Sequence, residues 1–250
     1  MAAQIKLGIL VPSSNTSLEP LTTAILSSLP NVSVHFSRFP VTRIALSQDA
    51  LSQFNDAPIL FAAQLLADAE VDIIGWSGTS AGWLGFEADE KLCRSIEERT
   101  GVKATTSVLA LNRLLAMVRE DSSGDGLQFG LVTPYLDDVQ AAIQETYAKA
   151  GLAIKAESHL RKTVNVEFAK VDERTLDGQM EDVVGRLGDG TKAVSTFCTN
   201  LRAAQRVQHW EAKHDGLVVF DTVATVVWDM LRLTGVDYRQ IKGWGKLFEM

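Results

Sequence analysis

Residues 5–11 read IKLGILV and are followed at once by PSSNT at residues 12–16. The first run is apolar apart from one lysine, which is typical of a strand buried on both faces of a parallel sheet. A run of the same character, LQFGLV at residues 127–132, leads into TPY at residues 133–135. Because such a strand begins each half of the chain, the sequence predicts two similar α/β halves.

Short apolar runs alternate with longer segments of helical periodicity along the chain. We predict strands at residues 5–11, 32–36, 71–75, 102–105, 127–132, 153–158, 193–197 and 216–220. We predict helices at residues 18–28, 47–69, 87–100, 107–118, 136–150, 173–187, 200–213 and 222–233. This alternation favours an α/β fold of doubly wound parallel sheets. A polar stretch at 120–126 separates the two series, so we assign residues 1–110 plus 222–250 to the first half and 111–221 to the second.

The composition is that of an ordinary globular protein, with 46% hydrophobic and 22% charged residues. A net charge of -7 without a basic stripe argues against a nucleic-acid partner. We find no apolar run long enough for a membrane span and no signal peptide, so we expect a cytoplasmic protein. The two cysteines, Cys93 and Cys198, are too few and too far apart for a zinc cluster or a disulfide framework, and we predict no metal site.

Small polar residues follow four of the predicted strands. They are PSSNT at 12–16, WSGTS at 76–80, TPY at 133–135 and CTN at 198–200. Ligands of α/β folds bind at the carboxyl ends of strands, where these residues lie. Taken singly, each loop has a structural explanation, because Ser, Thr and Asn commonly cap the next helix and a free cysteine is usually a packing residue.

Taken together, the four loops predict an anion site with a reactive thiol. Helix N-termini and hydroxyl groups bind carboxylates and stabilise an oxyanion. A thiol beside helix N-termini is shifted toward the thiolate and can give or take a proton at carbon. We therefore predict that Cys198 is catalytic. We assign no chemistry to Cys93, which lies within a charged helix.

The motifs resemble those of the aspartate/glutamate racemase superfamily, and most closely its arylmalonate decarboxylases and maleate cis-trans isomerases. PSSNT at 12–16 resembles the maleate isomerase motif whose Asn binds a substrate carboxylate. GTS at 78–80 matches the decarboxylase motif whose Thr and Ser line an oxyanion pocket. TPYLDDV at 133–139 is similar to the decarboxylase pattern T-x-Y-I/L-D-D-V, whose Tyr contacts the carboxylate. CT at 198–199 resembles the CT of amino-acid racemases, and GWGKLF at 243–248 is similar to GYGRLF of the decarboxylase.

The resemblance implies two pseudo-symmetric halves with the active site between them, and chemistry without a cofactor. It implies catalytic roles for Cys198, Gly78, Thr79, Ser80 and Tyr135. The residues that we expect to bind substrate are Pro12, Ser14, Asn15, Arg43, Asn165, Thr199 and Asn200. The expected partner is a small mono- or dicarboxylate. We expect no nucleic acid or membrane, and we leave a homo-oligomer open.

Gly78 is a departure from most of the superfamily. The racemases place one cysteine on each face of the substrate carbon, and maleate isomerase also uses a pair, whose first member would fall at position 78. A single thiol protonates from one face only. We therefore favour a decarboxylase of a substituted malonate, acting through an enediolate that Cys198 protonates. The alternatives are an isomerase of the maleate type, a racemase-like enzyme, and a catalytically silent protein that binds small acids.

The loop at residues 37–43 bears on the substrate. Arg43 or Arg38 could reach the site and bind a second carboxylate, although a solvated loop arginine is the simpler interpretation. Trp83 either shapes the pocket or packs in the core. We interpret the histidines as structural or surface residues; they are His35, His159, His209 and His214.

Overall fold

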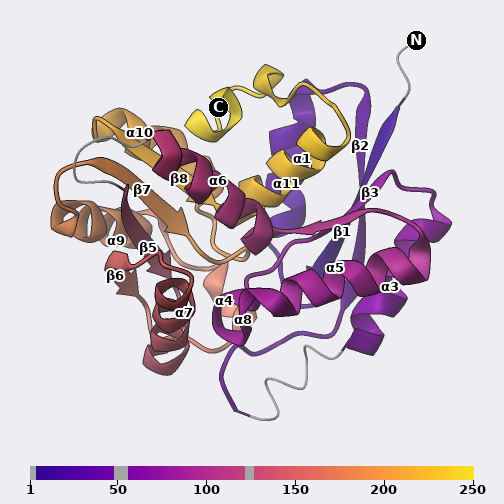
Figure 1. Cartoon of the computed structure of the whole chain (residues 1–250), viewed down its shortest axis with the longest axis horizontal. Helices are drawn as coiled ribbons and strands as arrows, with labels where there is room; N and C mark the ends of the chain where they lie inside the picture. The colour runs from indigo at the N-terminus through magenta and orange to yellow at the C-terminus, as the bar shows by residue number, and fades with distance from the viewer. Residues whose placement is uncertain (1–3, 48–55, 122–126) are drawn as a thin grey trace.

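Two four-stranded parallel sheets form the centre of the computed structural model, which describes residues 4–47, 56–121 and 127–250 (Figure 1). The first has the order β2-β1-β3-β4, with β1 (Ile5–Pro12), β2 (Val32–Phe39), β3 (Ile73–Trp76) and β4 (Ala104–Thr106). The second has the order β6-β5-β7-β8, with β5 (Leu127–Thr133), β6 (Ile154–His159), β7 (Thr191–Thr196) and β8 (Leu217–Asp221). The matching orders confirm the prediction of two similar α/β halves.

The central strands are buried, as their apolar runs predict. Strand β1 is buried from Leu7 to Pro12 and lies between β2 and β3. Its register pairs Pro12 with Phe39 and Leu10 with Trp76, so the carboxyl ends of three neighbouring strands end close together. The second sheet repeats this arrangement around β5, which lies between β6 and β7.

Most helices follow the segments of helical periodicity. They are α1 (Leu18–Ile25) with the 3-10 turn η1 (Leu26–Ser28), α3 (Asp56–Asp68), α5 (Phe86–Thr100), α6 (Ser107–Asp121), α7 (Asp137–Lys149), α9 (Glu173–Arg186), α10 (Val207–Lys213) and α11 (Thr222–Leu233). Helix α5 ends as predicted, at Gly101 in the left-handed conformation with φ of 71°. The predicted helix at 47–69 is described only from Asp56, because residues 48–55 lie outside the described part of the chain, and Ser47 is not helical.

The prediction of one helix over residues 200–213 is wrong. Residues 199–203 form turns, a 3-10 turn follows as η3 (Ala204–Arg206), and α10 begins only at Val207. Asn200 explains the change, because its side chain accepts hydrogen bonds from another loop and does not start a helix. Four short elements were not predicted. They are α4 (Ala81–Leu84), α8 (Asn165–Phe168), η4 (Tyr238–Gln240) and η5 (Lys246–Glu249).

Helix α11 joins the two halves. It follows β8 of the second sheet, and its residues from Thr222 to Leu231 are all buried. It packs against α6, as well as against β3 and β4 of the first sheet, and Figure 1 shows it crossing beside α6. Ser107 Oγ donates to the Thr222 carbonyl at 2.7 Å, and Thr225 Oγ1 donates to the Ser107 carbonyl at 3.0 Å. Because α11 contacts both halves, its assignment to the first half stays a prediction.

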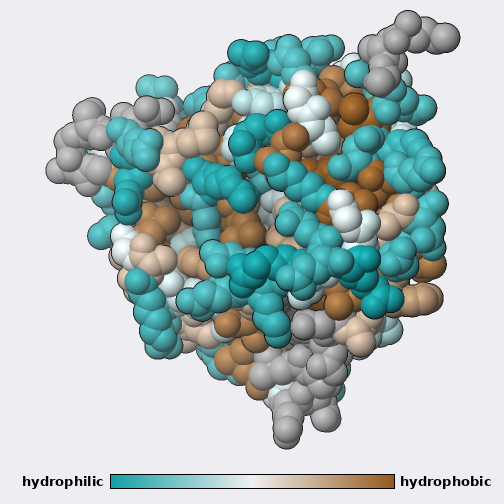
Figure 2. All heavy atoms as spheres, turned by 45° about the vertical axis from the view of Figure 1, so that its right-hand side comes forward, coloured by the Kyte–Doolittle hydropathy of each residue, from teal (hydrophilic) through white to brown (hydrophobic). Residues whose placement is uncertain are grey.

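The surface is mixed in character. Figure 2 shows hydrophilic residues over much of the face that it draws, with hydrophobic residues visible between them. Helix α3 exposes Phe61 and Leu65, which lie one turn apart. Within residues 4–47, 56–121 and 127–250, no helix has the length and apolar character needed to cross a membrane. The same residues contain no cluster of His, Cys, Asp or Glu suited to holding a metal ion.

Candidate active site

The loops after β1, β3, β5 and β7 meet at one small cavity between the two halves. The described residues that line it are Pro12, Val41, Ile44, Trp76, Gly78, Thr79, Ser80, Trp83, Tyr135, Asn165, Cys198 and Thr199. Its volume is about 20 Å³, room for roughly one water molecule. The structure thus brings most of the predicted site residues together. Ser14, Asn15 and Asn200 lie behind the lining, each hydrogen-bonded to a residue that lines the cavity.

Cys198 is a buried, protonated thiol. Only 3% of the residue is exposed, and burial raises its pKa from 9.0 to about 11. The nearby backbone N–H groups of Asn200 and Leu201 and the Tyr135 hydroxyl favour the thiolate, and they lower the pKa by less than burial raises it. The prediction of a thiol shifted toward the thiolate is therefore wrong. It assumed a helix starting at residue 200, whereas the residues after Cys198 form turns.

Tyr135 connects the thiol to the first half of the chain. Its hydroxyl lies 2.7 Å from Thr79 Oγ1. Either hydroxyl can be the donor in this contact. Burial, followed by the nearby Cys198, raises the pKa of Tyr135 well above 10.0, so the phenol keeps its proton. The ring is fixed by edge contacts with Trp83 and Phe168, at centroid distances of 5.4 and 5.8 Å.

Asn15 has both a capping role and a contact with the site. Its Oδ1 accepts from the backbone N–H groups of Ser17 and Leu18, at 3.0 and 2.9 Å, and so caps α1. Its Nδ2 donates to Thr199 Oγ1 at 3.2 Å. The Thr199 hydroxyl in turn donates to the Ser77 carbonyl at 3.3 Å. The Asn15 amide therefore reaches the cavity through Thr199, which is one of its lining residues.

The side chain of Asn200 holds loops of the two halves together. Its Oδ1 accepts from the N–H groups of Thr16 and Ser17, at 2.9 and 3.1 Å, and its Nδ2 donates to the Asn165 carbonyl at 2.6 Å. Asn165 Nδ2 donates to Ser14 Oγ at 2.8 Å. This network positions the lining residues, and Asn165 is the member of it that also faces the cavity.

The structure does not bring an arginine to the cavity. Arg38 donates to the carbonyls of Ser13 and Asn15, at 2.9 and 3.0 Å, and so braces the loop after β1. Arg43 is exposed, pairs with Val164 in an isolated β-bridge, and is absent from the described lining. The same segment instead contributes the apolar side chains Val41 and Ile44.

The indole of Trp76 occupies the space beside Gly78. A Cβ atom added to Gly78 would lie 2.0 Å from Trp76 Cζ2 and 2.3 Å from Cε2, closer than real carbon atoms approach. Trp76 is only 1% exposed and packs on Phe39 with ring centroids 5.1 Å apart. The sequence motifs predicted a role for Gly78 and none for Trp76, although an aromatic residue at the start of a strand-end loop is a usable signal. Gly78 therefore leaves the space that the indole of Trp76 occupies.

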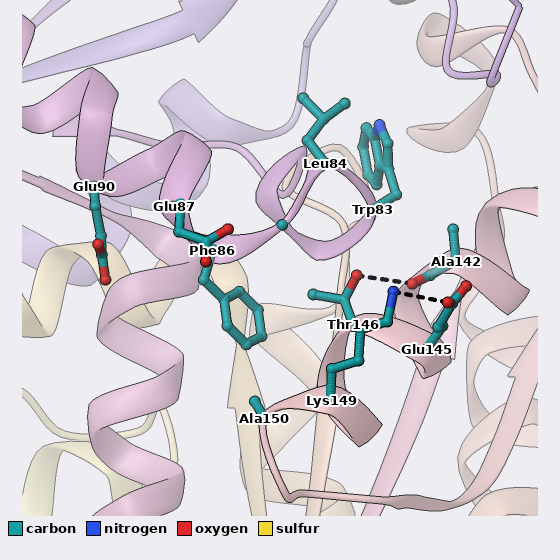
Figure 3. Close-up of a pocket in the computed structure, with 11 residues that line it drawn as sticks. Trp83, Leu84, Phe86, Glu87, Glu90, Ala142, Glu145, Thr146, Lys149 and Ala150 are labelled. Atoms are coloured by element: carbon teal, nitrogen blue, oxygen red, sulfur yellow. Dashed lines mark hydrogen bonds and ion pairs between the residues drawn. The ribbon is translucent and has the colours of Figure 1, made fainter.

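Trp83 separates the cavity from a larger groove. The groove has a volume of about 530 Å³ and lies between α7 and the segment of α4 and α5 (Figure 3). Glu145, Thr146 and Lys149 of α7 face Phe86 across it. Among the described lining residues, Trp83 is the one that the groove and the cavity share. Trp83 therefore does shape the pocket, one of the two roles considered for it.

The histidines stand apart from this cavity. His159 ends β6 and pairs with Asp137 and Glu157, at 2.6 and 2.8 Å. His214 contacts Glu181 at 2.9 Å. None of the described lining residues is a histidine, which leaves Cys198 and Tyr135 as the titratable groups of the described lining.

No family model of known proteins matches the chain, and no curated protein matches it. Solved structures match it over almost its whole length. A cysteine-to-alanine variant of the maleate isomerase of Pseudomonas putida, bound to maleate, is 21% identical with a TM-score of 0.82, over 98% of this chain and 97% of that one. A cysteine-to-serine variant of the maleate cis-trans isomerase of Nocardia farcinica, with a covalently bound succinylcysteine intermediate, is 19% identical with a TM-score of 0.85, over 98% of both chains.

Arylmalonate decarboxylase also matches. A variant with a glycine-to-cysteine and a cysteine-to-serine change, in the liganded form, is 22% identical with a TM-score of 0.81, over 98% of this chain and 99% of that one. The unliganded enzyme is 21% identical with a TM-score of 0.76, over 99% of both chains. The chain therefore has the fold that maleate isomerases and arylmalonate decarboxylases share, which confirms the fold implied by the sequence motifs. At these identities the likeness concerns the fold alone.

Proposed function

We propose that this chain is an enzyme that acts without a cofactor on the carbon next to a carboxylate, and that its reaction is the decarboxylation of a malonate-type diacid. The observation that carries the proposal is Cys198, a buried thiol that keeps its proton while facing the cavity. Gly78 supports it, since the indole of Trp76 leaves no room for a second thiol at that position. A site with one protonated thiol is suited to giving one proton to one face of a carbanion.

The reaction starts with loss of carbon dioxide from the bound diacid. The bond between the central carbon and one carboxylate breaks, and its electron pair moves into the remaining carboxylate to form an enediolate. The Cys198 thiol then donates its proton to the central carbon, which leaves a monoacid and a thiolate. Water restores the proton, so each turnover consumes one proton and releases one carbon dioxide. The second carboxylate makes the carbanion accessible, so the chemistry needs no metal or organic cofactor.

The surroundings of Cys198 suit both stages of this cycle. Burial favours the neutral thiol at rest, so a proton is in place when the enediolate forms. The N–H groups of Asn200 and Leu201 and the Tyr135 hydroxyl then stabilise the thiolate that remains. In the loop after β3, Thr79 and Ser80 also line the cavity and are donors for the enediolate oxygens.

Turnover of malonates in heavy water tests the proposal. We expect carbon dioxide from methylmalonate, and a propionate product that carries one deuterium at the central carbon. Ethylmethylmalonate extends the test, because it should give one enantiomer of the product. Cys198→Ala should abolish turnover, while Cys93→Ala, which removes the thiol outside the cavity, should not change it. Absence of carbon dioxide from every malonate tried would refute the decarboxylase.

The second candidate is a cis-trans isomerase of the maleate type. It is favoured by the fold shared with two maleate isomerases and by Asn15 and Asn165, whose side-chain amides connect to the lining. In that reaction the Cys198 sulfur adds to the double bond of maleate, the single bond formed rotates, and the sulfur leaves. Conversion of maleate to fumarate that is lost in Cys198→Ala would establish this reaction. If neither acid is converted but malonate binds, the chain is a silent small-acid-binding protein.

A further inference from the structure

Trp76 presents a hydrogen-bond donor that the fold itself does not use. It is the last residue of β3 and is 99% buried, and its indole Nε1 has no hydrogen-bond partner among the residues that the structure describes. Buried indole N–H groups usually find an acceptor, and leaving a donor unpaired costs free energy. An unpaired donor in a cavity wall is therefore a feature that a ligand can satisfy.

The six-membered ring of this indole lies at Gly78. Of the ring atoms, Cζ2 and Cε2 are the two that come closest to the added Cβ of Gly78, and Nε1 is bonded directly to Cε2. Both Gly78 and Trp76 line the cavity, together with Cys198. The ring that carries the unpaired N–H thus occupies the space where a side chain at position 78 would otherwise stand, and Nε1 is bonded to one of the ring carbons at that place.

The ring is also a fixed wall. It packs against Phe39 with a 5.1 Å centroid separation, and its backbone is hydrogen-bonded within the first sheet opposite Leu10 and Thr106. A substrate larger than the cavity must therefore gain its space elsewhere, on the side of Trp83, and not beside Gly78. Apolar side chains of Val41 and Ile44 complete the lining without adding a charge.

We propose that Trp76 binds the substrate and sets its size: its indole N–H donates to an anionic oxygen of the diacid, and its ring restricts the substrate to small malonates without an aryl group. The inference rests on the proposed function and deepens it by naming the substrate class. Trp76 supplies, as a hydrogen-bond donor, the anion contact that the exposed Arg43 does not bring to the cavity. The ring of Trp76 also explains why residue 78, next to the reacting carbon, is a glycine in this chain.

Nuclear magnetic resonance tests whether the Trp76 N–H binds an anion, and it needs no turnover. The chain has five tryptophans, so a protein labelled with nitrogen-15 gives up to five indole N–H signals. The signal of Trp76 is identified by its loss in Trp76→Phe. We expect malonate, added to the wild-type protein and to Cys198→Ala, to shift this signal downfield. The matched control is Trp228, whose buried Nε1 is also unpartnered but which is absent from the described cavity lining, and its signal should stay in place.

The kinetics of two variants test whether Trp76 restricts the size of the substrate. Trp76→Phe keeps most of the ring and removes the N–H, and we expect it to lower kcat/KM for methylmalonate about 10- to 100-fold, the range for losing a hydrogen bond to a charged group. Trp76→Leu removes the ring, and we expect it to gain turnover of phenylmalonate, which the wild-type protein should not accept. Trp228→Phe should behave like the wild-type protein.

The experiments distinguish a wrong role for Trp76 from a wrong overall reaction. If carbon dioxide is released but the Trp76 signal does not move with malonate, or if Trp76→Phe turns over methylmalonate as the wild-type protein does, Trp76 is a packing residue and the inference is overturned. Efficient decarboxylation of phenylmalonate by the wild-type protein would also overturn it. If no malonate is decarboxylated but malonate shifts the Trp76 signal selectively, the decarboxylase is refuted and the anion site at Trp76 stands.

Discussion

The pH dependence of Cys198 alkylation tests the central electrostatic claim. An alkylating reagent reacts with the thiolate, so the rate follows the ionised fraction of the thiol. Burial raises the pKa of Cys198 from 9.0 to about 11. A rise of about two units leaves roughly 100-fold less thiolate than an ordinary cysteine has at neutral pH. The rate should therefore climb about tenfold per pH unit from pH 7 to 10 without reaching a plateau.

The assay uses iodoacetamide on Cys93→Ala, so that Cys198 is the sole thiol. Labelling of the Cys198 peptide is followed by mass spectrometry at several pH values. The same variant unfolded in urea supplies the reference, whose rate should level off above pH 9. Restricted access in the folded protein lowers the absolute rate at every pH, whereas a raised pKa moves the position of the plateau. Comparing the shapes of the two curves of rate against pH therefore separates restricted access from a raised pKa.

A plateau below pH 9 in the folded protein would refute the reasoning. It would mean that Asn200, Leu201 and Tyr135 lower the pKa by more than burial raises it, and that a larger share of the resting sulfur is thiolate. A thiolate at rest is suited to adding to a double bond, so this result would also favour the isomerase over the decarboxylase.

Three further substitutions have defined outcomes. Gly78→Cys alone should lower the free energy of unfolding by about 1–3 kcal/mol in urea titrations, because its Cβ meets the Trp76 ring. Gly78→Cys combined with Trp76→Ala makes room for the second thiol and should racemise an α-substituted acid, as followed by chiral chromatography. Burial raises the pKa of Asp89 to about 7, so the folded protein keeps a proton on this carboxyl that the unfolded chain releases near pH 4. Between about pH 4 and 7.5 the wild-type protein should therefore lose roughly 4 kcal/mol more stability than Asp89→Asn. Equal slopes of unfolding free energy against pH in the two proteins would refute the shift. Asn200→Ala leaves buried donors unpaired and should cost about 2–4 kcal/mol in thermal or urea unfolding, whereas a cost below about 0.5 kcal/mol would show that the loops hold without it.

The fold was predictable because its pattern is local. Each buried strand is an apolar run and each covering helix is a periodic segment, and their alternation indicates parallel sheets. Strand ends also concentrate polar residues at one edge of each sheet, so Thr79, Tyr135 and Cys198 could be grouped before their positions were known. Their contact across the two halves then follows from the shared fold.

The errors arose at residues whose structure depends on contacts with residues far away in the sequence. Asn200 was expected to begin a helix, but its side chain binds the loop after β1, which is 183 residues away in sequence. Arg43 was considered as a substrate-binding residue, with a solvated loop arginine as the simpler interpretation, and it is paired with Val164 outside the described lining. The protonation state of Cys198 was misjudged because burial, which depends on the whole fold, outweighs the local N–H groups.

Gly78, Trp76 and Cys198 are best understood as one arrangement. A second thiol at position 78 would make proton transfer possible from both faces, but the indole fills the space that its side chain needs. With only one face served by a proton donor, the donor must hold its proton until the carbanion forms, and burial of Cys198 secures this by raising its pKa. In the proposed reaction, the N–H of Trp76 donates to the enediolate while the thiol of Cys198 protonates the carbon. Both residues line the same cavity, so a single proton donor serves the reacting carbon there.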